Sequence, residues 1–178
     1  RIPEIQIASP ASGKVVAVNR GDKRALLSIV IETDSSQEAE SFQKFTRDKI
    51  KGLSKVEITD VLLKGHLWPV IRQRPFSKVS DPHQKPKAIF VHAMNTEPLA
   101  PDIDFILQGK EEEFQAGLDV LKGLIDGEVH LCVARGAASK ALVQAANVQT
   151  HTFSGPHPAG NVSTHIHFVD PINKGDIV

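Results

Sequence analysis

Three cationic side chains lie among large apolar residues and prolines within residues 67–78. This mixture could hold a flat molecule, because aromatic rings stack on it and arginine or lysine donates hydrogen bonds to partly negative carbonyl oxygens. The same composition is also typical of a surface loop with anchored aromatic side chains. The candidate binding residues in this segment are Trp68, Ile71, Arg72, Arg74, Pro75, Phe76, Ser77 and Lys78.

A second candidate follows directly after an apolar run at residues 88–92. Residues 92–102 are rich in polar and turn-forming types and include Glu97 and Pro98. Open α/β sheets bind ligands in the loops at the carboxyl ends of their strands, and proline keeps the residue before it extended. The segment therefore predicts either a second binding loop, with Glu97 and Pro98 as its candidates, or a connector.

Histidine is concentrated between residues 151 and 167. Imidazole is a common zinc ligand and proton carrier. However, no carboxylate or cysteine stands close in sequence before Asp170, and two histidines two positions apart share a direction only in a strand. We expect no metal site, a rigid turn at residues 155–158, and packing or hydrogen-bonding roles for the histidines. The candidate ligands under the metal alternative are His151, His157, His165 and His167.

Common catalytic motifs are missing from the sequence, which has no Gly-x-Gly-x-x-Gly loop, no Walker loop and no Gly-x-Ser-x-Gly elbow. The single cysteine, Cys132, lies in an apolar run, so it can form neither an internal disulfide nor an iron–sulfur cluster. A reducing compartment is the simplest assignment. We expect no redox centre on this chain and no nucleotide-dependent catalysis by the chain alone.

The bulk composition is that of a globular protein. In 178 residues, 21 Lys and Arg balance 21 Asp and Glu, and 40% of residues are hydrophobic. This charge balance argues against nucleic acid as the main partner, and no stretch approaches the roughly 20 apolar residues that cross a bilayer. The chain starts at Arg1 without Met and ends at Val178, so we expect it to be a fragment of a longer protein.

The elements that must position these candidates change type near residue 40. Short strands are predicted at residues 5–7, 14–18 and 26–31, with turns between them. Residues 1–33 therefore predict a partial β barrel-sandwich piece that resembles half of a biotinyl/lipoyl-type barrel. We find no lysine at a hairpin tip that would carry a prosthetic group.

Residues 41–178 show alternating strand and helix patterns. Ser54 and Glu57 form a capping box before a helix at residues 56–63, and Pro69 suits the first turn of a short helix. A second helix begins at Glu111 and ends before Gly127. Further strands at residues 88–92, 129–134 and 148–153 and a helix at 138–145 predict an α/β, Rossmann-like parallel-sheet domain with helices on its faces.

Several segments stand in the order found in one known family. Residues 9–16 (SPASGKVV), 74–78 (RPFSK), 96–99 (TEPL), 155–161 (GPHPAGN) and 164–167 (THIH) together resemble the A subunits of the Na⁺-translocating NADH:quinone reductase. The resemblance spans nearly the whole chain. This family is similar in fold to the C subunit of Rnf-type complexes and to the NADH-oxidising flavoprotein of respiratory complex I.

The chain departs from those flavin-binding relatives after Trp68. They place a glycine-rich loop there, in which bare backbone N–H groups approach the flavin phosphate. In this sequence, Arg-Gln-Arg-Pro-Phe stands at residues 72–76, so proline removes one donor and bulky side chains fill the space. The resemblance therefore implies that the flavin site is lost and that another ligand can use the pocket.

The resemblance implies a component of a sodium pump that oxidises NADH and reduces ubiquinone. It places the protein on the cytoplasmic face of the bacterial inner membrane, attached through the integral-membrane B subunit, with the flavins and iron–sulfur centres in other subunits. Trp68 and residues 71–78 would contact the ubiquinone headgroup, with Arg72, Arg74 or Lys78 donating to its carbonyls and Phe76 stacking. The alternatives are a purely structural docking module and a module that binds FMN through unfamiliar contacts.

Overall fold

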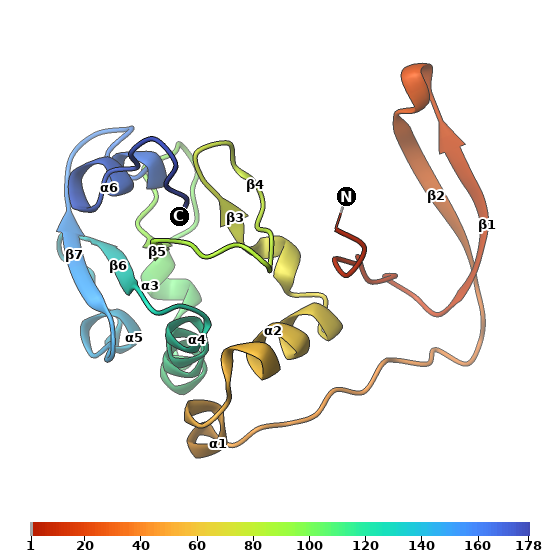
Figure 1. Cartoon of the computed structure of the whole chain (residues 1–178), viewed down its shortest axis with the longest axis horizontal. Helices are drawn as coiled ribbons and strands as arrows, with labels where there is room; N and C mark the ends of the chain where they lie inside the picture. Colours follow the sequence, from red (N-terminus) through yellow and green to blue (C-terminus); the bar gives the residue numbers. More distant parts are fainter. Residues whose placement is uncertain (1) are drawn as a thin grey trace. The chain divides into compact units, whose positions relative to one another are not determined.

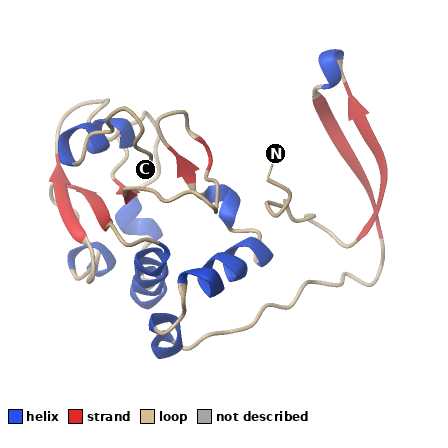
Figure 2. Ribbon diagram, viewed as in Figure 1, coloured by secondary structure: helices blue, strands red, loops and turns tan. Residues whose placement is uncertain are grey.

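A computed structural model describes residues 2–178 and separates them into two units. One unit is Gln6–Lys44, and the other is Phe45–Val178 together with the described residues up to Ile5. Figure 1 shows the course of the chain, and Figure 2 shows its helices and strands. Within residues 2–178, no helix combines the length and the apolar character needed to cross a membrane.

The smaller unit is a β-hairpin. Strand β1 (Gly13–Arg20) pairs antiparallel with β2 (Leu26–Thr33), so both longer strands predicted in this part are confirmed. Gly13 has φ 148°, and a Cβ there would lie 2.1 Å from the Glu32 carbonyl oxygen, so this position requires glycine. The turn η1 (Asp22–Arg24) places Lys23 at the hairpin tip, which corrects the expectation that no lysine stands there.

The strand predicted at residues 5–7 does not form. None of these residues belongs to a strand, and Ile7 is exposed. Ile5 instead packs against the core of the larger unit. So short a segment gains little from strand geometry unless a partner strand satisfies its backbone groups.

A three-stranded parallel sheet forms the centre of the larger unit. Its strands are β5 (Ala88–Ala93), β6 (Glu128–Ala134) and β7 (Gln149–Phe153), in the order β5-β6-β7. The three strands predicted for this region are confirmed, and β6 is buried along most of its length because it lies in the middle. A small antiparallel pair, β3 (Arg72–Gln73) and β4 (Lys78–Val79), has no counterpart in the sequence prediction and interrupts the first candidate segment.

The two faces of this sheet differ in chemistry because successive strand residues point to opposite sides. On one face, Val129, Leu131 and Val133 pack with apolar side chains of the helices α2 (Lys55–Lys64), α4 (Glu111–Leu124) and α5 (Lys140–Val143). On the other face, Phe90 stacks on His130, and His92 stacks on His165 of helix α6 (Val162–Val169). The first face is the hydrophobic core, and the second is lined with imidazoles.

Local capping residues and contacts from distant residues both determine where the helices begin and end. Their bounds are α1 (Arg47–Lys51), α2 (Lys55–Lys64), η2 (Trp68–Val70), α3 (Ile103–Ile106), α4 (Glu111–Leu124), α5 (Lys140–Val143) and α6 (Val162–Val169). The predicted capping box is confirmed: Ser54 N–H donates to the Glu57 carboxylate at 2.8 Å, and Glu57 N–H donates to Ser54 Oγ at 3.3 Å.

Helix α5 is shorter than the predicted 138–145. The N–H groups of Ala138 and Ser139 donate to the Asp104 carboxylate, at 2.9 and 3.0 Å, instead of entering the helix. At the other end, Asn147 has φ 63°, a left-handed conformation that no helix continues. An acid 34 positions away thus sets the start of this helix.

Gly127 has a different role from the predicted helix stop. Helix α4 ends at Leu124, and Ile125 is already extended. The φ of Gly127 lies outside the left-handed region, and a Cβ there would lie 2.1 Å from the Lys87 carbonyl oxygen. Glycine is therefore needed because the backbone before β6 passes very close to the backbone before β5.

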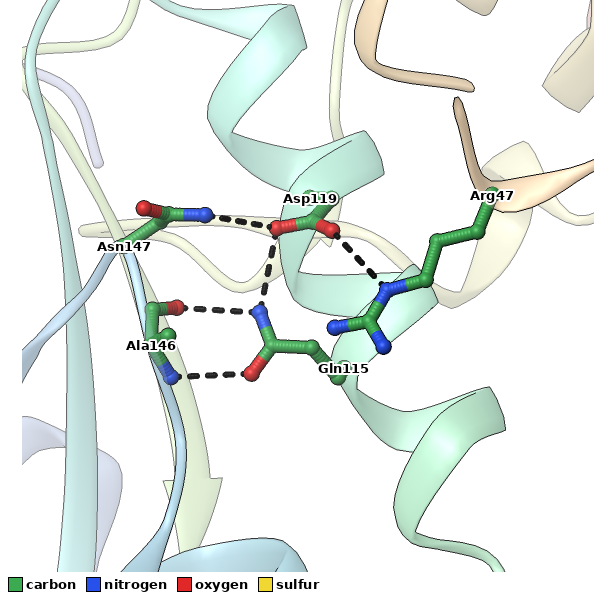
Figure 3. Close-up of polar contacts among 5 residues, drawn as sticks. All are labelled: Arg47, Gln115, Asp119, Ala146 and Asn147. Carbon is green, nitrogen blue, oxygen red and sulfur yellow. Dashed lines mark hydrogen bonds and ion pairs between the residues drawn. The ribbon is translucent and has the colours of Figure 1, made fainter. Parts of the chain in front are cut away.

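A polar network joins α4 to the connection between α5 and β7 (Figure 3). The Gln115 amide donates to Ala146 O at 3.0 Å and accepts from Ala146 N–H at 2.8 Å. The carboxylate of Asp119 accepts from Gln115 and Asn147, both at 3.0 Å, and pairs with Arg47 at 3.8 Å. The network provides hydrogen-bond partners for the backbone N–H and C=O of Ala146, which lie outside any strand or helix.

We expect Gln115→Leu to lower the free energy of unfolding by about 2 kcal/mol, because both polar groups of Ala146 lose their partner. Urea denaturation followed by the fluorescence of the single tryptophan measures this change. Gln108→Leu, at an exposed position, is the matched control. Equal stability of the two variants would contradict a structural role for this network.

Candidate functional site

A pocket of about 500 Å³ lies beside β5, one of the two outer strands of the parallel sheet. Four consecutive residues, from Ile89 to His92, line it. Because neighbouring strand residues point to opposite faces, a pocket that touches all four runs along the hydrogen-bonding edge of the strand. Other lining residues come from α4, α6, β3 and the last two residues of the chain, Ile177 and Val178.

Trp68 builds one wall of this pocket. Its side chain is 5% exposed, and its Nε1–H donates to Ser80 O at 2.8 Å. Pro69 lies in the first turn of the short helix η2, which begins at Trp68, as predicted. Because the indole N–H is already bound, Trp68 offers a ligand the apolar surface of its ring and no free donor.

Strand β3 and the turn that follows it bring two arginines, Arg72 and Arg74, to the pocket. The Arg72 guanidinium donates to Ser77 O at 2.6 Å. Arg74 donates its backbone N–H to Val178 O at 2.7 Å, whereas no carbonyl or carboxylate within residues 2–178 receives its guanidinium. The Arg74 guanidinium is thus available to an oxygen of a ligand.

The first candidate segment is divided by the structure. Trp68, Ile71, Arg72 and Arg74 line the pocket, whereas Pro75, Phe76, Ser77 and Lys78 do not. These four residues form the turn and the start of the second strand of the β3–β4 hairpin. The Phe76 ring is 84% exposed at this turn.

The second candidate loop lies at the carboxyl end of β5, as predicted, but Glu97 and Pro98 are exposed and do not line the pocket. Asn95 accepts the Glu97 N–H at 2.9 Å, which turns the chain locally. Thr96, the residue before them, makes the tertiary contact, because its Oγ accepts from Gly160 N–H at 2.9 Å.

Gly160 allows the loops after β5 and β7 to meet. A Cβ at this position would lie 2.5 Å from Thr96 N, so a larger residue would separate the two loops. His92 Nε2 is hydrogen-bonded to Gly160 O, and His157 Nδ1 lies 3.3 Å from Thr96 Oγ. We call residues 92–98 with residues 154–161 the loop clasp.

The four histidines named as metal candidates are placed apart. His151 Nε2 lies 3.1 Å from His130 Nδ1, and His157 belongs to the loop clasp. Helix α6 buries His165 completely and leaves His167 exposed, which decides between the strand and helix alternatives for this pair. Within residues 2–178 no three His, Cys, Asp or Glu side chains gather as a metal site.

The buried titratable groups beside the pocket are held in their neutral forms. Burial lowers the pKa of His165, and the hydrogen bond to Ala159 O opposes this only in part. Burial and then the neighbouring His151 lower the pKa of His130. Burial raises the pKa of the Cys132 thiol to about 12. The imidazole-lined face therefore offers hydrogen-bonding groups and no thiolate nucleophile.

His92 is one of the pocket residues that the sequence analysis did not name as candidates. The sequence marks it only as the first residue of the loop after β5. A polar side chain near the carboxyl end of a predicted strand is a weak signal for it. Its place in the pocket depends on the loop clasp, which joins residues 68 positions apart.

Comparison with known proteins gives consistent matches along the chain. The model of the NqrA N-terminal barrel-sandwich hybrid domain matches residues 1–34, and that of the NqrA second alpha/beta domain matches residues 53–178. The A subunit of the Na(+)-translocating NADH-quinone reductase from Yersinia pseudotuberculosis serotype O:1b is 42% identical over 178 residues. The protein with the same name from Neisseria gonorrhoeae strain NCCP11945 is 42% identical over 176 residues.

Each of these alignments covers 99% of the chain but 39% of the relative. The chain thus spans about two fifths of the length of the curated relatives that it matches. The matches support the two predicted fold types, barrel-sandwich and α/β.

Proposed function

Since the chain belongs to the NqrA family, the A subunits of the Na⁺-translocating NADH-quinone reductase, we propose that it forms part of such a protein and binds quinone beside β5. The observation that carries this proposal is an apolar pocket of about 500 Å³ with Arg74 in its wall. Within residues 2–178 the guanidinium of Arg74 has no acceptor. A quinone headgroup is flat and apolar, with carbonyl oxygens as its polar atoms. Apolar walls with a few placed donors suit such a ligand.

Individual residues have distinct roles in this proposal. Arg74 donates to a carbonyl oxygen, and Arg72 supports it while also holding the β3–β4 turn through Ser77 O. The ring of Trp68 and the side chain of Ile71 supply apolar contact. Glu97 and Pro98 act indirectly, by shaping the loop that carries Thr96.

The proposed setting is a sodium pump that oxidises NADH and reduces ubiquinone. In this setting the protein lies on the cytoplasmic face of the bacterial inner membrane and is held there by the integral-membrane B subunit. The chain carries no redox centre of its own, and the flavins and iron–sulfur centres belong to other subunits. We propose residues 1–33 as the barrel-sandwich module and 41–178 as a Rossmann-like module without a flavin loop.

A second candidate function is docking onto the membrane-embedded part of the pump. The specific observation in its favour is the Phe76 ring, which is 84% exposed at the turn between β3 and β4. Exposed aromatic residues beside cations are common at protein interfaces. A third alternative, FMN binding, is separated by the visible absorption of purified protein.

The proposal is tested by binding of a labelled short-chain ubiquinone to the purified chain. We expect Arg74→Met to weaken binding about tenfold, because one charge-assisted hydrogen bond is lost while the apolar stem is kept. Lys78→Met is the matched control, since Lys78 is exposed on β4 and outside the pocket. Equal affinity of both variants would contradict the pocket assignment.

Phe76→Ala separates the two functions further. We expect it to leave the affinity for quinone within about threefold, because the ring does not line the pocket. A large loss of binding would show that the turn folds over the ligand, as stacking by Phe76 requires. Absence of binding to the unaltered chain would favour docking.

A further inference from the structure

One histidine in the β5 wall of the pocket has a ring nitrogen that already makes a hydrogen bond. His92 lines the pocket, and its Nε2 is hydrogen-bonded to the carbonyl oxygen of Gly160. A carbonyl oxygen can only accept, so Nε2 must carry the proton of this bond. In the neutral ring, Nδ1 then holds a lone pair and acts as an acceptor.

The loop clasp holds this ring in one orientation. Gly160 is buried, and its N–H donates to Thr96 Oγ at 2.9 Å, so the carbonyl that orients His92 is itself fixed. On the other side, the ring of His165 lies 5.3 Å from that of His92, between ring centres. His165 Nε2 is in turn bonded to Ala159 O at 2.9 Å, so both imidazoles are fixed by neighbouring carbonyls of one loop.

Three of the other acceptors that line the pocket already receive hydrogen bonds. Gln73 Oε1 accepts from Asp81 N–H at 3.3 Å, and Val178 O accepts from Arg74 N–H at 2.7 Å. The Asp81 carboxylate accepts from His83 N–H and from the Gln84 amide. For His92 Nδ1, by contrast, no donor is found within residues 2–178.

We propose that His92 Nδ1 accepts a hydrogen bond from a hydroxyl group of a reduced quinone, so that the pocket binds hydroquinone as well as quinone. This inference rests on the proposed quinone site. A quinone offers only carbonyl acceptors, which arginine satisfies. A hydroquinone offers hydroxyl donors, and the partly engaged ring of His92, which is exposed, offers an acceptor for one of them. The donor, Arg74 in the turn after β3, and the acceptor, His92 on β5, give the pocket a partner for each form.

The test compares two ligands and three variants. A short-chain ubiquinone and, without oxygen, its ubiquinol are titrated into the chain and into its His92→Phe, His92→Asn and His167→Phe variants. Phenylalanine keeps the ring volume and removes both nitrogens, whereas asparagine places an oxygen near the position of Nδ1. His167 is exposed on the same helix as His165 and serves as the matched control.

We expect His92→Phe to weaken ubiquinol binding about tenfold, and ubiquinone binding by less than about twofold. His92→Asn should recover most of the affinity for ubiquinol, and His167→Phe should bind both ligands as the unaltered chain does. Retained ubiquinone binding shows that a variant is folded.

Three results overturn the inference. If His92→Phe loses both ligands equally, His92 shapes the pocket and does not distinguish the two forms. If the unaltered chain binds ubiquinone but no ubiquinol, the pocket has no acceptor for the reduced form. If it binds neither ligand, the proposed quinone site itself is wrong and the inference falls with it.

Discussion

Replacing Trp68 by alanine is expected to lower the free energy of unfolding by about 3–5 kcal/mol. The side chain is 5% exposed and belongs to the core cluster with Ile58, Leu124 and Val129. Its removal leaves a cavity and also leaves Ser80 O without the indole donor. Urea denaturation followed by far-ultraviolet circular dichroism measures the change.

Trp68→Phe is the matched comparison for this prediction. It keeps most of the apolar volume and loses the hydrogen bond to Ser80 O, so we expect a smaller destabilisation of about 1–2 kcal/mol. A loss below about 1 kcal/mol in the alanine variant would show that the wall of the pocket is not part of the core. Trp68 therefore links the stability of the domain to the shape of its pocket.

Gly127→Ala is expected to cost about 3 kcal/mol, at the upper end of the usual range for overpacking. The added Cβ would lie 2.1 Å from the Lys87 carbonyl oxygen, and backbone cannot move aside as a flexible side chain can. The two strands that follow, β5 and β6, would have to separate at their start. Urea denaturation followed by Trp68 fluorescence measures the loss.

Gly127→Asn distinguishes close backbone approach from a helix cap. Asparagine is tolerated at left-handed positions, so it would cost little if Gly127 ended α4 in that conformation. Because φ at Gly127 lies outside the left-handed region, we expect asparagine to be at least as harmful as alanine. A variant with asparagine that is clearly more stable than the alanine variant would support the cap instead.

Elements whose signals are local were predictable. The capping box of Ser54 and Glu57 is encoded within four residues, and Phe114, Leu118 and Leu121 form an apolar stripe at helical spacing in α4. The β-rich runs at β5, β6 and β7 are equally local, and all three strands form. The run at residues 5–7 has the same pattern, but no neighbouring strand pairs with it.

The candidate site was predictable in part. A mixture of aromatic and cationic residues indicated the segment that contains Trp68, Arg72 and Arg74, and these residues do line one pocket. Composition could not show that the next residues turn away, because the short hairpin of β3 and β4 makes that turn. It also gave little weight to His92, whose ring is oriented by a carbonyl 68 positions away.

The sequence by itself determined the class of the fold, the order of most elements, and the family resemblance, because periodicity, capping residues and ordered motifs are properties of the linear chain. Tertiary structure decided the start of α5 through Asp104, the need for glycine at Gly127 through Lys87, and the partner of His92 through Gly160. Each of these three features depends on a contact between residues far apart in the sequence. Such a contact forms only when the sheet brings the two segments together, so no local sequence pattern predicts it.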